Sequence, residues 1–212
     1  EVFTRPHDPY TIKLINSRPE RAVRPVPAAA PVLAAARGVN VDFVSAKGWF
    51  GRNVFHAVRD ATLELKRGET LGIVGESGSG KTTLGMALLA LQPIASGSVA
   101  LEDIRLDGAD RRTLRAMRRR MQVVFQDPFA SLSPRMTIEQ IVGEGLETHM
   151  PELTRQERRQ RILAMLAEVG LSEEQGITDL LTRYPHEFSG GQRQRIAIAR
   201  AVVLHPEVLV LD

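Results

Sequence analysis

The chain of 212 residues contains no cysteine. This absence excludes a disulfide scaffold, a cysteine-ligated zinc or iron–sulfur site, and a thiol nucleophile. Aromatic residues make up only 5% of the chain, and no apolar run approaches the roughly 20 residues that a helix needs to cross a bilayer. The net charge of +3 is small, so charge alone does not indicate a nucleic-acid partner. The first residues lack the pattern of a secretory signal peptide, which makes the cytoplasm the default expectation.

The first 37 residues differ in composition from the rest of the chain. Proline stands at positions 6, 9, 19, 25, 27 and 31, and proline both removes a helix hydrogen-bond donor and biases its predecessor to extended geometry. Within segment 1–17, residues 10–16 are a short amphipathic piece that predicts one or two helical turns. Residues 18–37 are expected to form a semi-rigid linker. The main domain is therefore predicted over residues 38–212.

Beyond residue 38 the apolar residues follow an α/β pattern. Alternation of apolar and polar residues predicts strands over 39–43, 61–65 and 98–106. Two nearly continuous apolar runs, at 70–74 and 208–211, predict strands that are covered on both faces. Helices are predicted over 82–91 and after a capping box formed by Thr154 and Glu157.

A glycine-rich sequence, Gly-Glu-Ser-Gly-Ser-Gly-Lys-Thr, spans residues 75–82 between a predicted strand and a predicted helix. It matches the P-loop pattern, in which glycines let backbone N–H groups approach phosphate oxygens and the helix N-terminus favours the anion. Lys81 is predicted to reach the β- and γ-phosphates, and the Thr82 hydroxyl is predicted to bind Mg²⁺. The strand, lysine, threonine and helix together make a plain glycine-rich turn a much poorer explanation.

A second helix start has the same character. Ser189 and Gln192 predict a capping box, but the two glycines between them each cost up to about 1 kcal/mol relative to alanine in a helix interior. Such a start is explained if bare N–H groups must approach a phosphate. The two phosphate-binding helix starts are about 110 residues apart, which is more than one nucleotide needs.

The run 189–192 resembles the signature motif of the ATP-binding cassette (ABC) family. Leu209–Asp212 resembles the Walker B strand, and 123–128 resembles the Q-loop with Gln126 as its glutamine. The resemblance covers residues 38–212. It implies an α/β P-loop NTPase of the ABC nucleotide-binding type, with a RecA-like core, an antiparallel β subdomain and a helical subdomain over about 127–188. In the family a water-activating glutamate and a γ-phosphate-sensing histidine follow the aspartate, so a chain that stops at Asp212 is expected to be a C-terminally truncated domain.

Several segments look most like the ATPases of dipeptide and oligopeptide importers, namely 75–80, 124–128, 131–135 and 184–195. Residues 3–14 are similar to the tail that follows the ATPase core in those proteins. A tail at the front of the chain suggests a fused protein of two cassettes, as in ATPases of the YejF type that serve peptide and microcin C import. The alternative, an N-terminal extension of a single-cassette subunit, stays open.

The resemblance implies roles for individual residues. Phe43 stands where the family stacks an aromatic ring on adenine, although an ordinary apolar strand-end residue is the alternative. The nucleotide is expected to contact Phe43, Gly75, Ser77, Gly78, Ser79, Gly80, Lys81, Thr82 and Thr83 of one cassette, and Ser189, Gly190, Gly191 and Gln192 of the opposite one. Thr82, Gln126 and Asp212 are expected to bind Mg²⁺, and Gln126 and Asp212 also to act in catalysis.

The function implied by the resemblance is ATP binding and hydrolysis that energises import of oligopeptides or a microcin, with ATP and Mg²⁺ as cofactors. The expected partners are a second cassette placed head-to-tail, transmembrane permease subunits and, indirectly, a peptide-binding protein outside the membrane. No nucleic acid is expected, and the location is peripheral, at the cytoplasmic face of the membrane. Without the glutamate the chain is expected to hydrolyse ATP about 10²–10⁴-fold more slowly. Two alternatives remain: a soluble ABC-type ATPase acting on nucleic acid or the ribosome, and a nucleotide-binding fragment without turnover.

Overall fold

The computed structural model describes residues 7–16, 25–47, 51–127, 131–172 and 179–212. The chain divides into two units, Glu1–Ala30 and Pro31–Asp212. In the first unit, helix α1 (Pro9–Asn16) is capped by Asp8, whose carboxylate accepts hydrogen bonds from the backbone N–H groups of Tyr10 at 2.9 Å and Thr11 at 3.0 Å. The helical turns predicted at 10–16 are confirmed, and the capping aspartate explains why they begin there.

A four-stranded antiparallel sheet opens the second unit, in the order β2-β1-β3-β4. Its strands are β1 (Val32–Lys47), β2 (Gly51–Lys66), β3 (Ser96–Leu101) and β4 (Ile104–Arg105). The predicted strands 39–43 and 61–65 lie inside β1 and β2. The predicted strand 98–106 is instead a hairpin, because the chain turns at Glu102, which has a left-handed φ of 52°.

The predicted linker 18–37 differs from the structure in its last residues, because β1 already begins at Val32. Ala34 and Ala36 are buried, with 1% and 0% of their surfaces exposed, and they pair with residues of both β2 and β3. A run of alanine and proline is the composition of a linker. Here the small side chains instead let a central strand pack closely, which composition alone does not reveal.

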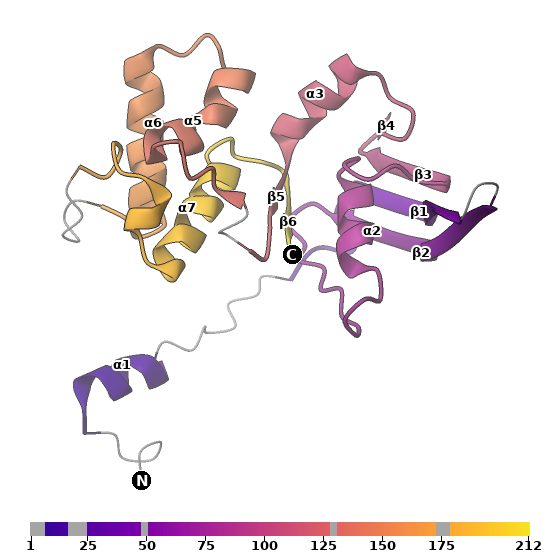
Figure 1. The fold of residues 1–212 in the computed structure, drawn as a ribbon, viewed down its shortest axis with the longest axis horizontal. Coiled ribbons are helices and arrows are strands. Elements are labelled where there is room, and N and C mark those ends of the chain that lie inside the picture. The colour runs from indigo at the N-terminus through magenta and orange to yellow at the C-terminus, as the bar shows by residue number, and fades with distance from the viewer. Residues whose placement is uncertain (1–6, 17–24, 48–50, 128–130, 173–178) are drawn as a thin grey trace. The chain divides into compact units, whose positions relative to one another are not determined.

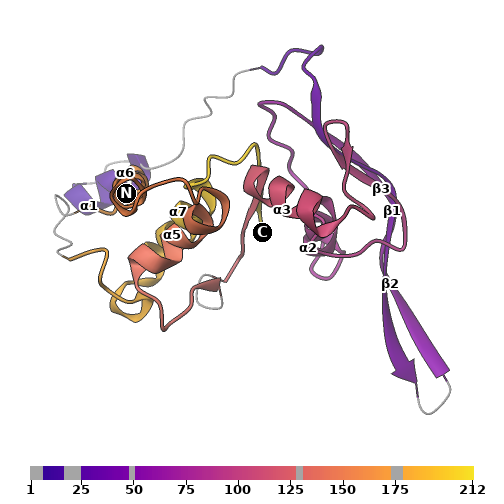
Figure 2. The same ribbon diagram turned by 90° about the horizontal axis from the view of Figure 1, so that it is seen from above.

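Asn40 and Ser96 are the last residues that pair between β1 and β3. Past this pair, β1 and β2 continue as a two-stranded arm (Figure 2). Helix α2 (Lys81–Leu88) lies against the sheet (Figure 1), and its Ala87 and Leu88 join the sheet's hydrophobic core. The predicted helix 82–91 is thereby confirmed, although it ends earlier than predicted.

The second sheet is a parallel pair, β5 (Met121–Val124) and β6 (Val208–Leu211), with helix α3 (Arg111–Arg120) leading directly into β5. The strand predicted at 208–211 is confirmed, but its predicted burial on both faces is wrong, because Leu209 is 38% and Leu211 70% exposed. The strand predicted at 70–74 is wrong, since these residues form no strand and Val74 is 93% exposed. A strand covered on both faces needs hydrogen-bonded neighbours, and β5 and β6 pair with each other instead. A cavity of about 610 Å³ is lined by residues of 69–73 and of 207–212.

Three helices form a separate hydrophobic core: α5 (Ile138–His149), α6 (Arg155–Glu168) and α7 (Gly190–Val202). Figures 1 and 2 show them grouped on the other side of β5 and β6 from the antiparallel sheet. The capping box predicted at Thr154 and Glu157 begins α6 and is confirmed. The core of this group includes Ile196 and Ala199 of α7, so it extends past the end of the region predicted over about 127–188.

Candidate functional site

The P-loop wraps around the amino group of Lys81. Its Nζ donates hydrogen bonds to the backbone oxygens of Gly75 at 2.9 Å and Glu76 at 2.7 Å, and lies 3.5 Å from Ser79 Oγ. Helix α2 begins at this lysine, so the first N–H groups of the helix and the ammonium group are at the same place. A positive charge beside unpaired N–H groups at a helix start is the arrangement that the sequence predicts for binding an anion.

Glycine is required at position 80 for two independent reasons. The residue has a left-handed φ of 89°, which side-chain-bearing residues rarely adopt. A β-carbon there would also lie 2.3 Å from the backbone oxygen of Ala57 in β2. The loop therefore rests directly on the backbone of β2, and this contact fixes where the P-loop lies relative to the antiparallel sheet.

A cavity of about 550 Å³ lies between the P-loop and β2, within the range of about 300–1,000 Å³ that is typical of small-molecule sites. Its lining consists of Phe55, His56, Ala57, Val58, Arg59, Ala61, Ile73, Val74, Gly75, Gly78, Ser79, Gly80, Lys81 and Leu84. Five predicted nucleotide-binding residues are thus on one cavity wall. Phe43 is not one of the lining residues. It pairs across the strands with Phe55, which does line the cavity.

Sequence reasoning missed Phe55, His56 and Arg59 as residues of this cavity. The β1–β2 register shifts repeatedly between Val32 and Asp42, so the face on which a given side chain lies does not follow from alternation. An aromatic residue ahead of the 61–65 strand was the available signal, but nothing in the sequence linked it to the P-loop.

Thr82 and Asp212 are 130 positions apart in sequence, and the fold joins them. Thr82 Oγ1 donates a hydrogen bond of 2.6 Å to Asp212 Oδ1. Asp212 follows β6, and its N–H donates to the oxygen of Val124 at the end of β5. Gln126 follows the same end of β5, so the three predicted Mg²⁺ ligands come from the P-loop helix and from the shared carboxyl edge of the parallel pair.

The donor types at this edge fit Mg²⁺. A hydroxyl, an amide oxygen and a single carboxylate are hard oxygen ligands, and Mg²⁺ is commonly held by one or two carboxylates together with phosphate oxygens and water. Among the residues that the structure describes, no group of three or more His, Asp or Glu side chains gathers as a metal site. A ligand set with a single carboxylate leaves coordination positions for phosphate oxygens and water.

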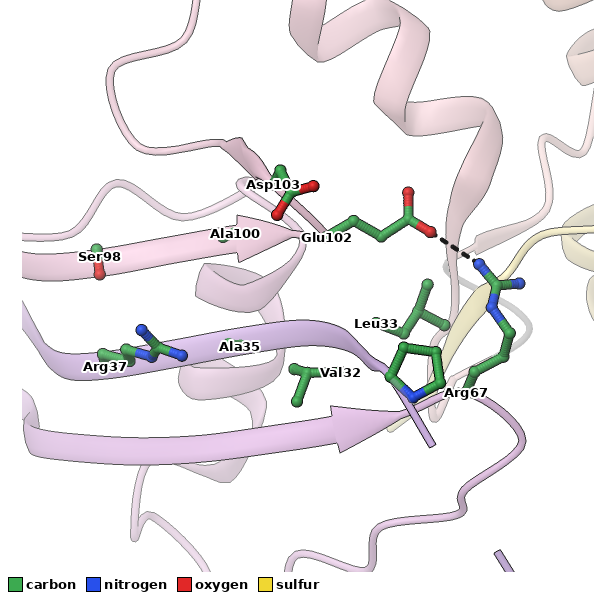
Figure 3. A pocket seen from close by; sticks show the side chains of 10 residues that line it. Val32, Leu33, Ala35, Arg37, Arg67, Ser98, Ala100, Glu102 and Asp103 are labelled. Atoms are coloured by element: carbon green, nitrogen blue, oxygen red, sulfur yellow. Dashed lines mark hydrogen bonds and ion pairs between the residues drawn. The ribbon is translucent and has the colours of Figure 1, made fainter. Parts of the chain in front are cut away.

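A ring of four charged residues connects the antiparallel sheet to β5 and β6. Arg67, in the turn after β2, pairs with Glu102 at 2.8 Å and Glu207 at 2.7 Å, and Arg120 pairs with the same two glutamates. Figure 3 shows Arg67 and Glu102 joined to each other at one end of the residues that line a cavity of about 520 Å³. Hydrogen bonds from Arg120 and Arg67 lower the pKa of Glu207 to about 2. Because Glu207 immediately precedes β6, this ring helps to fix the strand that carries Asp212.

The start of α7 forms the predicted capping box. Ser189 Oγ accepts from the N–H of Gln192 at 3.3 Å, and the side chain of Gln192 accepts from the N–H of Ser189 at 2.8 Å. Gly190 and Gly191 are exposed, and a β-carbon at either would meet nothing within 4 Å. Helix α7 packs mainly against α5, α6 and β5 rather than the P-loop helix. The described chain therefore contains no steric reason for two glycines here.

Residues 58–212 match the family model described as "ABC transporter", and the chain belongs to this family. Among solved structures, it superposes on the dimeric structure of MJ0796, a bacterial ABC transporter cassette, with a TM-score of 0.73 and 29% identity. That match covers 85% of this chain and 73% of the other. A post-hydrolysis dimer of MJ0796 bound to ADP and Pi matches equally well. The cassette fold expected from the sequence motifs is confirmed.

Two curated relatives from Escherichia coli K12 have the same level of identity. The ABC transporter ATP-binding protein YejF, described as uncharacterized, is 46% identical over 213 residues, which is 100% of this chain but 39% of YejF. The oligopeptide transport ATP-binding protein OppF is 46% identical over 176 residues, covering 82% of this chain and 51% of OppF. The chain thus spans about two fifths to one half of the relatives that it matches. The expected likeness to peptide-importer ATPases is confirmed.

Proposed function

We propose that the chain is a nucleotide-binding cassette that binds MgATP between the P-loop and β2 and uses ATP hydrolysis to energise peptide import. The observation that carries the proposal is the 2.6 Å hydrogen bond between Thr82 and Asp212, because it joins the P-loop helix to the acidic end of β6. Glycine-rich turns occur in many proteins. Few of these turns would bring the threonine that follows the lysine into hydrogen-bond contact with an aspartate 130 positions away.

Each part of the site has a separate task. The ammonium group of Lys81 and the N–H groups at the start of α2 bind the β- and γ-phosphates, together with Gly75, Ser77, Gly78, Ser79, Gly80 and Thr83 around them. Thr82, Asp212 and Gln126 would hold Mg²⁺, which neutralises developing negative charge on the phosphates. Phe43 and Phe55 form an apolar cross-strand pair, and an adenine ring stacks on it at the β2 end of the cavity.

The exposed start of α7 serves a second nucleotide. Ser189, Gly190, Gly191 and Gln192 present N–H groups and side chains to the γ-phosphate of ATP that is bound to an opposite cassette. The open space around the two glycines supports this role. Two cassettes therefore close head-to-tail around two nucleotides, and hydrolysis followed by product release reopens them.

The peptide-import assignment rests on OppF, whose name states oligopeptide transport. Transmembrane permease subunits would be the direct partners, and the cassette would lie at the cytoplasmic face of the membrane. No helix of the described residues is long and apolar enough to cross a membrane. We also propose that segment 1–17 is the tail of a preceding cassette; the alignment with YejF covers 100% of this chain and so includes this segment.

The proposal is tested by changing Thr82 to valine, which keeps the shape of the side chain and removes its hydroxyl. Wild-type chain should bind fluorescently labelled ATP more tightly with Mg²⁺ than with a chelator, and Thr82→Val should lose most of that difference. In the full-length protein expressed with its permease, the same change should abolish uptake of a radiolabelled tripeptide. ATP binding that ignores both Mg²⁺ and the substitution would refute the assignment.

A further inference from the structure

The cavity beside the P-loop is also lined by a histidine that the proposed mechanism does not use. His56 lies on β2, and its Nδ1 is 2.7 Å from Oδ1 of Asp42, its cross-strand partner on β1. The histidine side chain is 47% exposed and the aspartate 27%. One ring nitrogen is therefore held by the protein, while half of the ring remains accessible.

The backbone next to His56 is fixed by the P-loop itself. In the register, Val41 pairs with Val58 and Asp42 pairs with His56, so Ala57 is an extra residue on β2. Such bulges re-aim the neighbouring side chains. The oxygen of Ala57 is also the atom against which Gly80 packs so closely that a β-carbon would clash. His56 is thus one residue away from a direct contact between β2 and the phosphate-binding loop.

The hydrogen bond to Asp42 determines what the other nitrogen offers. A carboxylate accepts, so Nδ1 of the ring carries the proton, and Nε2 of a neutral imidazole is then an acceptor. We propose that His56, oriented by Asp42, accepts a hydrogen bond at Nε2 from the nucleoside part of the bound nucleotide. The donor is a nucleoside N–H or O–H, either the exocyclic amino group of adenine or a ribose hydroxyl. This inference rests on the proposed nucleotide site and adds a residue that distinguishes among nucleotides.

Calorimetric titration of the whole chain with two ligands isolates the effect. ATP contains the nucleoside, whereas inorganic tripolyphosphate contains only the phosphates. His56→Ala should weaken ATP binding by about 3- to 10-fold, the equivalent of one net hydrogen bond, and leave tripolyphosphate binding unchanged. Asp42→Ala should cause a smaller loss of the same kind, because the ring is then no longer oriented. Asp42→Asn should restore part of the affinity, since its amide oxygen still accepts from Nδ1–H.

Asn53→Ala is the matched control, because Asn53 is exposed on the same strand and does not line the cavity. It should change neither affinity. Two nucleotides then identify the donor. If the adenine amino group is the donor, His56→Ala should leave binding of inosine triphosphate unchanged. If a ribose hydroxyl is the donor, the substitution should weaken inosine triphosphate binding but leave 2′,3′-dideoxy-ATP unaffected.

The outcomes separate this inference from the proposed function. Wild-type chain that binds neither ATP nor tripolyphosphate contradicts the proposed nucleotide site and the role of His56 with it. Wild-type chain that binds both, with His56→Ala binding both equally well, overturns the histidine contact alone. Loss of tripolyphosphate binding in His56→Ala also overturns it, because the residue would then support the loop rather than contact the nucleoside.

Discussion

Replacing Gly191 with alanine should have opposite effects on the stability of the chain and on its association. In the structure a β-carbon at this position meets nothing within 4 Å, and the residue lies in the first turn of α7. Alanine favours a helix interior over glycine by about 0.8–1 kcal/mol, and the gain in a first turn is smaller. The isolated chain should therefore become more stable by about 0.5 kcal/mol, which raises Tm by roughly 1–2 °C for a protein of this size.

The same substitution should weaken dimerisation of the chain if a phosphate of the opposite cassette's ATP occupies the open space beside Gly191. The added methyl group keeps one N–H from a charged oxygen, and such hydrogen bonds are worth about 1.5–3 kcal/mol. A head-to-tail dimer of two identical chains contains this contact twice, so ATP-dependent dimerisation should weaken by at least about 100-fold. Thermal unfolding without nucleotide measures the first effect, and sedimentation equilibrium with ATP measures the second.

Gln156→Gly is the mirror-image control for Gly191→Ala. Gln156 occupies the equivalent second position of α6, which starts with the same kind of capping box. The Gln156→Gly variant should lose about as much stability as Gly191→Ala gains, and its ATP-dependent dimerisation should be unchanged. A Gly191→Ala variant that is less stable than wild type, or that dimerises normally with ATP, would show that the glycine serves the fold and not an external phosphate.

Three further changes test the surrounding structure. Gly80→Ala should destabilise the chain by more than 1 kcal/mol and abolish ATP binding, because the left-handed φ and the close approach of Ala57 both forbid a β-carbon. Chemical denaturation measures the loss of stability, and calorimetry measures the loss of ATP binding. Since the pKa of Glu207 is lowered from 4.5 to about 2, its contribution to stability should be full above about pH 4.5 and disappear as the pH falls toward 2. Glu207→Gln should flatten that part of the pH–stability curve, and an unchanged curve would mean that the ion-pair ring contributes nothing. Asp110→Ala should cost about 1 kcal/mol in urea unfolding by removing the cap of α3, whereas Asp103→Ala, in the β3–β4 turn, should cost less.

The sequence predicted best those features that depend on local chemistry. The capping boxes at Thr154 and Ser189 need only residues three positions apart, and both are present. The resemblance to the family motifs assigns Thr82 and Asp212 to one site, and the structure brings them into contact.

The errors arise where tertiary partners decide the outcome. Alanines 34–36 are a buried central strand because β2 and β3 pair with them on both edges, and a small-residue run carries no sign of such neighbours. Residues 70–74 have the composition of a buried strand but no strand partner among the described residues. The cavity residues Phe55 and His56 depend on a bulge in β2, which shifts the register by a single residue and cannot be read from alternation.

The most direct test of the account is a calorimetric titration of MgATP into the wild-type chain and into Lys81→Ala. Lys81 is the side chain around which the P-loop closes, so its removal should eliminate measurable binding while leaving the thermal unfolding of the chain nearly unchanged. Arg111→Ala removes a positive charge from an exposed position on α3 and should bind like wild type. Equal affinity of wild type and Lys81→Ala for MgATP would contradict the claim that the P-loop is the nucleotide site.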